Sequence, residues 1–428
     1  MRKIHLKKGL MLKIPQLSGS PIFYGTILLS TAEMLPIYEA LPSIIRHATF
    51  LASVALILLD TLQIKKYSVD FFCTIGLAIL INIYAYFQIY ASWNFAYYLV
   101  QVIRGWLFVM LGVYYSCYGN DNEKKIITYI IVTIAVVTAI TSTITVKSYP
   151  EAVRALGNAD LHAGADVQYL YVRNTANWGI LYGNVFLIPT LINKYKRRKA
   201  KIWIVVLLII EFFILSSQVT FGIIFSLMFL IFLFIKPFDA KKMVLFIALF
   251  IGTIVLFQNY LDDILYFIRY TILDQFDGLE TLKNRIYELY RSVQYGQFVG
   301  DGAARLELYS ISLNTFLHYP IFGYNANSDV LYHAHVGRHS QILDNMAALG
   351  IVGFVPLCVL ILSKGKSIYN SINTKESKNY QLLTYIIFGI LALVNPVFNT
   401  PAVFLSVFLF PTLINTSDAV EIIPSNRS

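Results

Sequence analysis

Charged residues and cysteines are both scarce in this chain. Only 14% of its 428 residues are charged, whereas a soluble domain usually carries about 25%. Hydrophobic residues make up 57% of the sequence, and the mean hydropathy is +0.63. The three cysteines, Cys73, Cys117 and Cys358, fall in or beside apolar runs, and no pair has CxxC spacing. These features exclude a soluble enzyme, a disulfide framework and a thiolate metal site.

The net charge of +10 raises the question of nucleic-acid binding. The basic residues, however, cluster in short segments between apolar runs, which is the pattern of membrane topology. We therefore expect membrane lipid, and no nucleic acid, as a partner. The basic N-terminal stretch MRKIHLKKGLMLK is not followed by a short apolar segment with a small-residue cleavage site. It is expected to be a cytoplasmic tail and not a signal peptide.

Long apolar runs recur along the chain. A spanning helix needs about 20 mostly apolar residues, and this rule predicts about twelve spans. The predicted spans are 22–38, 43–63, 70–91, 95–118, 125–146, 176–193, 202–218, 219–236, 243–260, 343–363, 382–398 and 401–415. The sequence thus predicts an all-α polytopic membrane protein. It divides into an N-terminal bundle (1–260), a large outer loop (261–342), and C-terminal helices with a cytoplasmic tail (343–428).

Lysine and arginine predict the orientation of these spans. Basic segments follow every second predicted span. They are Lys65 with Lys66, Lys124 with Lys125, KYKRRKAK at 194–201, Lys236 with Lys241 and Lys242, and KGK at 364–366. The opposite segments 91–94 and 395–402 carry no Lys or Arg. Positive segments stay inside, so both termini should be cytoplasmic in a multi-pass protein of the cell membrane. The long loops 147–175 and 261–342 should then face outward.

Arginines and histidines concentrate in the two long outer loops. Five of the seven histidines lie there. The residues are His162, His318, His333, His335, His339, Arg154, Arg173, Arg269, Arg285, Arg291, Arg305 and Arg338. Arginine holds phosphate with a bidentate fork, and histidine is the commonest general base. Together, beside a bilayer, they indicate a site for a lipid-linked phosphate or pyrophosphate. The alternative is that they are ordinary solvated charges.

Two further groups have alternative interpretations. Arg104 and Glu211 lie inside predicted spans. Such charges are functional by default, or they pair with each other and only fix packing. The stretch HAHVGRH (333–339) has metal-like spacing, but no acidic or thiol ligand lies close by in the sequence. We therefore expect no metal, and no other cofactor.

Residues 300–354 combine an amphipathic helix, a turn and a His-Ser pair. The pattern consists of Arg305 at the head of a helix that ends before Pro320, the turn FGYN at 322–325, then His339, Ser340, Asp344 and Gly350. This order resembles the core of the O-antigen ligase and Wzy-type polysaccharide polymerase superfamily. VRALGNAD (153–160) is similar to its Arg-x-x-Gly element, and NTANWGILYGN (174–184) resembles its Asn-rich helix entry. One departure is Asn325, which stands where the family turn often has a second Gly.

The resemblance implies a GT-C-like membrane glycosyltransferase. Such an enzyme moves glycan from undecaprenyl pyrophosphate to an acceptor on the outer face of the cytoplasmic membrane. The leading hypothesis is a polymerase that joins lipid-linked repeat units of a capsule, exopolysaccharide or O-antigen. A flippase and a chain-length regulator would be its protein partners. The alternatives are a ligase for finished glycan and a lipid-linked oligosaccharide flippase. A transporter should place polar residues near the midplane of two similar halves, and this chain has unlike halves.

The resemblance also implies roles for individual residues. Arg305 and Arg154 would hold the pyrophosphate and stabilise the leaving group as it gains charge. His339 would orient or deprotonate the attacking hydroxyl. The further substrate-binding candidates are Arg173, Arg338, Ser340 and Asp344. Five residues along a helix correspond to about 140° of rotation, so Asp344 is expected to cap the helix or line the cavity, without orienting His339.

The predicted orientation can be tested by thiol labelling of a variant whose three native cysteines are serines. A cysteine replacing Ser292 or Asn327 should react with an impermeant reagent in intact cells, because both positions should face outward. A cysteine replacing Ser367 should react only after lysis. Labelling of the Ser367→Cys variant alone in intact cells would reverse the assignment of the two faces.

Overall fold

The computed structural model describes residues 19–87, 95–156, 165–234, 260–276, 280–324, 336–398 and 400–415, and these contain helices but no strand. The N-terminal helices are α1 (Pro21–Met34), η1 (Pro36–Ala40), α2 (Ser43–Thr61), α3 (Lys65–Ala85), α4 (Phe95–Cys117) and α5 (Asp121–Ser148). The middle helices are α6 (Ala152–Ala155), α7 (Ala165–Val172), α8 (Trp178–Arg198), α9 (Ile202–Ser216) and α10 (Thr220–Phe234). The predicted fold class is thus confirmed at the level of an all-helical protein.

The second half of the chain begins with helices of the predicted outer loop. These are α12 (Leu261–Phe267), η4 (Ile268–Ile272), η5 (Leu273–Gln275), α13 (Glu280–Tyr295) and α14 (Asp301–His318). The C-terminal helices are α15 (Gln341–Ser371), α16 (Lys375–Val394), α17 (Pro401–Phe404), η6 (Leu405–Leu409) and α18 (Phe410–Asn415). The helix predicted to end before Pro320 is confirmed as α14.

Six helices within the described residues are long and apolar enough to cross a membrane, which indicates a multi-pass membrane protein. Their spans are Ser43–Thr61, Lys65–Ala85, Tyr98–Cys117, Asp121–Ser148, Gln341–Ser371 and Lys375–Val394. Other predicted spans coincide with shorter apolar helices, such as Ile202–Ser216 and Pro401–Ile414. Helix α1 is short because Leu35 is extended and Pro36 starts a 3₁₀ turn. The predicted span 243–260 lies, apart from its last residue, outside the described residues.

The core of the bundle lies between α4, α8 and the C-terminal stretch α17–η6–α18. Helix α4 packs against α17 and η6, and α8 packs against α17, η6 and α16. Residues of α4 and of the C-terminal stretch, such as Phe108, Met110 and Phe410, are fully buried. A helix that is apolar all round is either buried among other helices or surrounded by lipid, and the near-complete burial of this stretch shows the first case. The C-terminal stretch is therefore an integral part of the core.

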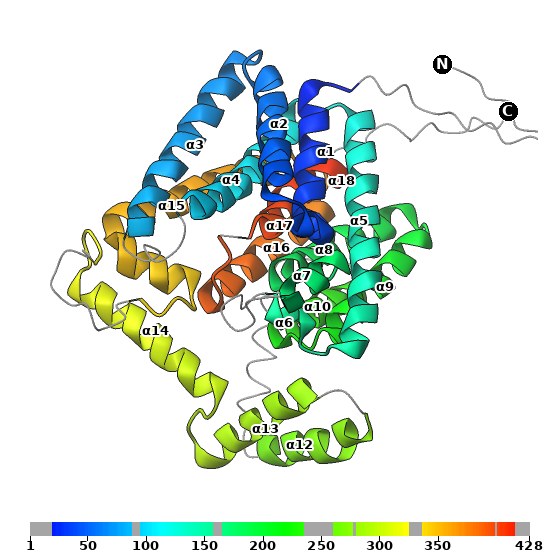
Figure 1. Ribbon diagram of the computed structural model, residues 1–428, viewed down its shortest axis with the longest axis vertical. Helices are drawn as coiled ribbons and strands as arrows, with labels where there is room; N and C mark the ends of the chain where they lie inside the picture. Colours follow the sequence, from blue (N-terminus) through cyan, green and yellow to red (C-terminus); the bar gives the residue numbers. More distant parts are fainter. Residues whose placement is uncertain are drawn as a thin grey trace, which may run out of the picture.

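The two ends of the bundle differ in the segments that they carry. In Figure 1 the α2–α3 connection and the start of α5, with their lysine pairs, lie at the top. Helices α6, α12 and α13 lie toward the opposite end. Segments from both long outer loops are thus found at the end away from these lysines. This separation agrees with the predicted orientation.

The charged residues inside the bundle do not form the Arg104–Glu211 pair that one interpretation of the sequence predicts. Arg104 of α4 contacts Glu33 of α1, with 3.0 Å between Nη1 and Oε1, and the two side chains are only 8% and 7% exposed. Glu211 of α9 instead accepts a hydrogen bond of 3.0 Å from Ser226 of α10. The Arg104–Glu211 pairing is therefore wrong, because each residue has a nearer polar partner. Both contacts join neighbouring helices, as expected of polar groups within a bundle.

Helix α15 is broken at Gly350, and the turn after α14 fills the break. Gly350 has φ 56° and ψ −169°, a conformation that essentially only glycine adopts. The N–H groups of Ile351 and Val352 donate instead to the carbonyls of Pro320 and Ile321, at 2.8 and 3.1 Å. The predicted span 343–363 is thus corrected to a short first helix up to Gly350 followed by a longer one. The turn couples α14 to this break.

Replacing Gly350 by alanine should destabilise the protein. An alanine Cβ there would lie 2.3 Å from the Ile321 carbonyl oxygen, and strain plus overpacking together cost about 2–6 kcal/mol. Gly389→Ala in α16 is the control, because its Cβ would meet nothing within 4 Å. Reversible unfolding in mixed micelles should show a large loss for the first variant and none for the second. Equal stability of both would contradict the packing described for the turn.

Candidate functional site

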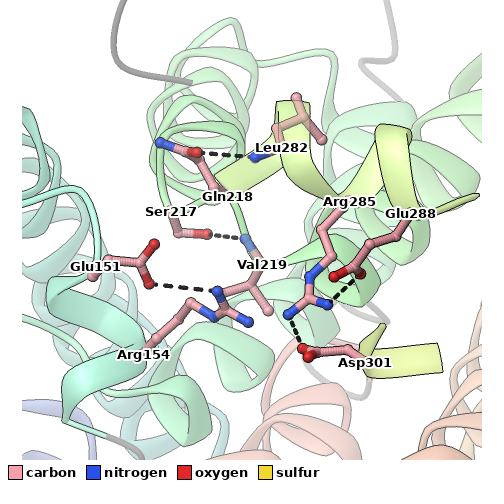
Figure 2. A network of polar contacts seen from close by, with 9 residues as sticks. All are labelled: Glu151, Arg154, Ser217, Gln218, Val219, Leu282, Arg285, Glu288 and Asp301. Atoms are coloured by element: carbon pink, nitrogen blue, oxygen red, sulfur yellow. Dashed lines mark hydrogen bonds and ion pairs between the residues drawn. The ribbon is translucent and has the colours of Figure 1, made fainter. Parts of the chain in front are cut away.

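Arginines from both outer loops converge beside the α9–α10 turn. Arg154 of α6 contacts Glu151 at 3.4 Å, and Arg285 of α13 contacts Glu288 at 2.8 Å and also Asp301. Figure 2 shows the two guanidinium groups pointing into the same space, next to Val219 at the start of α10. The two predicted outer loops therefore contribute arginines to one region of the structure, although these arginines are far apart in the sequence.

Arg305 lies one turn beyond Asp301 on α14 and completes this cluster. Its Nη1 donates to the Val394 carbonyl at 3.3 Å and to Oδ1 of Asn395 at 3.4 Å. The pKa of Asp301 is lowered, first by the hydrogen bond from Arg285 and further by the charges of Arg285, Arg154 and Arg305, while partial burial opposes the shift. Asp301 thus contacts Arg285 directly and also feels the charges of Arg154 and Arg305. We call Arg154, Arg285 and Arg305 the arginine cluster.

Asn395 and Tyr182 link the arginine cluster to the membrane bundle. The buried Tyr182 side chain of α8 interacts with the Asn395 side chain, and it also interacts electrostatically with Arg305 and Arg154. Asn395 also accepts, through its backbone carbonyl, a 3.3 Å hydrogen bond from the N–H of Gln341. Sequence analysis missed both residues, since it treated 395–402 only as a loop without basic residues. An Asn-Pro pair at the end of an apolar run marks a helix end, but not a contact with Arg305.

The loop that carries His339 is fixed to α14 by a buried hydrogen-bond network. Ser312 Oγ donates to Asp344 Oδ1 at 2.6 Å and accepts from the Gly337 N–H at 2.9 Å. Asp344 also accepts from the N–H groups of Arg338 and Ser340, at 3.2 and 3.1 Å. These two residues flank His339. The four hydrogen bonds of this network therefore set the backbone on either side of the imidazole.

The geometry assumed for Asp344 and His339 needs a correction. Ser340 caps the helix, with its side chain accepting from the Leu343 N–H at 3.1 Å, so α15 begins at Gln341 and His339 precedes it. The helical rotation of about 140° between the two residues therefore does not apply. Asp344 accepts from the N–H groups of residues just before its own helix, and so it caps the start of α15. Arg338, next to His339, is exposed and has φ 60°, a strained value typical of functional sites.

The imidazole of His339 has one nitrogen engaged with the backbone. Its Nδ1 lies 3.2 Å from the Gly337 carbonyl oxygen. A carbonyl oxygen only accepts, so Nδ1 must donate its proton in this hydrogen bond. In the neutral ring, Nε2 is then the unprotonated nitrogen. His339 is half-buried and can present Nε2 as a base.

The other candidate residues have different surroundings. Arg173 is exposed and stacks on Tyr169 of α7, with its guanidinium 4.7 Å from the ring centroid. His318 lies on α14 with its Nδ1 2.8 Å from the Asn314 carbonyl oxygen. His162, His333, His335 and Asn325 fall outside the described residues. Among the residues that the structure describes, no group of three or more His, Cys, Asp or Glu is arranged to hold a metal ion.

Comparison of the chain with protein-family models, curated proteins and solved structures gives no match. An arginine cluster suits a phosphate-type anion, and the neighbouring histidine loop offers a general base.

Removing the Ser312 hydroxyl should loosen the His339 loop. Ser312→Ala leaves the Gly337 N–H without its acceptor and takes a donor from Asp344, which should cost about 1–3 kcal/mol of stability. Ser310→Ala is a matched control on the same helix, because Ser310 is exposed; it should change stability by less than about 0.5 kcal/mol. Unfolding in mixed micelles measures both variants, and similar values for the two would contradict the network.

Proposed function

We propose that the chain is a polysaccharide polymerase that joins undecaprenyl-pyrophosphate-linked oligosaccharide repeat units on the outer face of the cytoplasmic membrane. In this proposal the arginine cluster binds the pyrophosphate of the donor, and His339 acts on the acceptor hydroxyl. The long apolar helices support this proposal, because a polyprenyl-linked substrate would be held in a bilayer.

The observation that carries the proposal is the convergence of Arg154 and Arg305. They belong to the two predicted outer loops, yet Arg305 lies one turn after Asp301 on α14, and Figure 2 shows Arg154 pointing into the space beside Asp301. Both charges lower the pKa of this carboxyl. The sequence resemblance assigns these same two arginines to the pyrophosphate. Guanidinium groups suit such a ligand because they form paired, charge-assisted hydrogen bonds with its oxygens. The sequence resemblance says nothing about the distance between Arg154 and Arg305, so their proximity in the fold is separate support for the proposal.

The residues support a direct displacement at the anomeric carbon of the donor sugar. The acceptor hydroxyl oxygen attacks this carbon as the bond between it and the phosphate oxygen breaks. The hydroxyl proton passes to Nε2 of His339, and the electron pair of the broken bond leaves with the pyrophosphate. Fixed cations at the leaving group stabilise the charge that develops in the transition state.

Contacts between the two groups support a shared site. Asn395 contacts Arg305 with its side chain and the Gln341 N–H with its backbone carbonyl. Gln341 follows His339 by two residues. In addition, Ser312 of α14 holds Gly337, two residues before His339. His339 and Arg305 are therefore fixed to one scaffold made of α14, the start of α15 and the end of α16.

Glycan analysis of cells that carry His339→Ala tests this function. Loss of a general base typically costs about 10²–10⁴ in rate, so chain growth should stop and single lipid-linked repeat units should accumulate. His318→Ala is the control, since His318 is exposed on α14 and has no role in the proposal. His339→Gln can hydrogen-bond but cannot take the proton, and it should also fail to restore growth.

Other outcomes would contradict the proposal. Normal glycan length in the His339→Ala strain, with normal protein abundance, would exclude His339 as the base. Accumulation of long lipid-linked polymer, in place of single repeats, would indicate the ligase alternative. Restoration of the full rate by His339→Gln would limit the residue to orienting the hydroxyl.

A further inference from the structure

Arg285 is held by two carboxylates that differ in their surroundings. Its Nη1 contacts Glu288 Oε2 at 2.8 Å, one turn along the same helix, and its Nη2 contacts Asp301 at the start of α14. The Glu288 side chain is 31% exposed, whereas that of Asp301 is 55% exposed. Glu288 therefore orients the guanidinium on its own helix, and Asp301 occupies the open side, where a ligand could replace it.

Asp301 also lies where an anion would lie in the arginine cluster. It interacts electrostatically with Arg285, Arg154 and Arg305 together. A carboxylate and a phosphate oxygen are equivalent partners for the guanidinium fork. An exposed ion pair contributes little to stability, so a diphosphate with more oxygens and more charge can displace this carboxylate.

The position of Arg285 does not depend on Asp301 alone. The N–H of Leu282, at the start of α13, donates to Oε1 of Gln218 in the α9–α10 turn at 3.3 Å. Figure 2 shows this contact on the side of α13 away from Asp301. Helix α13 is thus fastened to the bundle next to Arg154. Displacement of Asp301 would free the guanidinium without releasing the helix.

From this geometry we infer that Arg285 is a third arginine that binds the diphosphate of the substrate, and that Asp301 occupies the diphosphate position until the ligand arrives. The inference rests on the proposed function and deepens it, because neither residue was singled out by the sequence resemblance. It predicts opposite effects for the two partners of one ion pair. A purely structural ion pair would give the same effect for both.

The test is calorimetric binding of inorganic pyrophosphate to the full-length protein in detergent micelles. Arg285→Gln should weaken binding at least tenfold, because a charge-assisted donor is lost. Asp301→Asn should strengthen binding several-fold, because a competing negative charge is removed while the side-chain shape is kept. Weaker binding in both variants would overturn the role of Asp301, and unchanged binding in Arg285→Gln would overturn the role of Arg285.

A second Arg–Asp pair in the same outer loop supplies matched controls. Arg269 and Asp274 contact each other at 2.6 Å, and Arg269→Gln and Asp274→Asn should leave pyrophosphate binding unchanged. If these two control substitutions change the pyrophosphate affinity as strongly as the Arg285 and Asp301 substitutions, the overall charge of the loop explains binding and the inference fails. Thermal unfolding of every variant shows that the fold is intact, and the comparison is restricted to the folded variants.

Glycan analysis of the same variants separates this inference from the proposed function. Pyrophosphate binding that depends on Arg285, in a protein whose His339→Ala variant still makes normal glycan, would overturn the polymerase proposal and support the anion site. If Arg285→Gln leaves pyrophosphate affinity unchanged while His339→Ala stops glycan growth, this inference alone is overturned.

Discussion

The Asp344 carboxylate accepts three hydrogen bonds, one from α14 and two from the loop before α15, and much of the candidate site depends on it. Asp344 is almost fully buried, and a buried carboxylate is stable only when its oxygens are satisfied. Satisfying them requires Ser312 to face the start of α15, which fixes the rotation of α14 about its axis. Arg305 lies two turns earlier on α14, so its direction toward Val394 and Asn395 follows from the same constraint.

The arginine cluster shows how a membrane bundle can assemble a charged site from separate loops. Arg154 follows α5 directly, Arg285 is fastened through α13 to the α9–α10 turn, and Arg305 is positioned by α14. Each arginine contacts a carboxylate or backbone carbonyl, which keeps three like charges in one place without a ligand. Under the proposed function, a multiply charged anion would compete with these carboxylates for the guanidinium groups.

Sequence patterns predicted the helices better than the contacts between them. Hydropathy located α2, α3, α5 and α16 because one stretch of about 20 apolar residues is a local signal. Glu33, Asn395 and Arg285 could not be assigned in this way, since their partners lie 71, 90 and 16 residues away. Such pairings depend on how whole helices pack, and no local periodicity records them. The sequence predicted Asp344 as a helix cap or a cavity-lining residue. The rotation of about 140° assumed that His339 lies inside the helix, whereas α15 begins only at Gln341.

The break in α15 has a consequence for how the chain is made. Two amide groups after Gly350 find their acceptors in residues 320 and 321, which the ribosome synthesises about thirty residues earlier. When Ile351 and Val352 leave the ribosome, their partners have therefore already emerged. The unsatisfied backbone groups that make broken helices costly in lipid need exist only briefly. The turn precedes the break in the order of synthesis, so both acceptors are present when the two amide groups emerge.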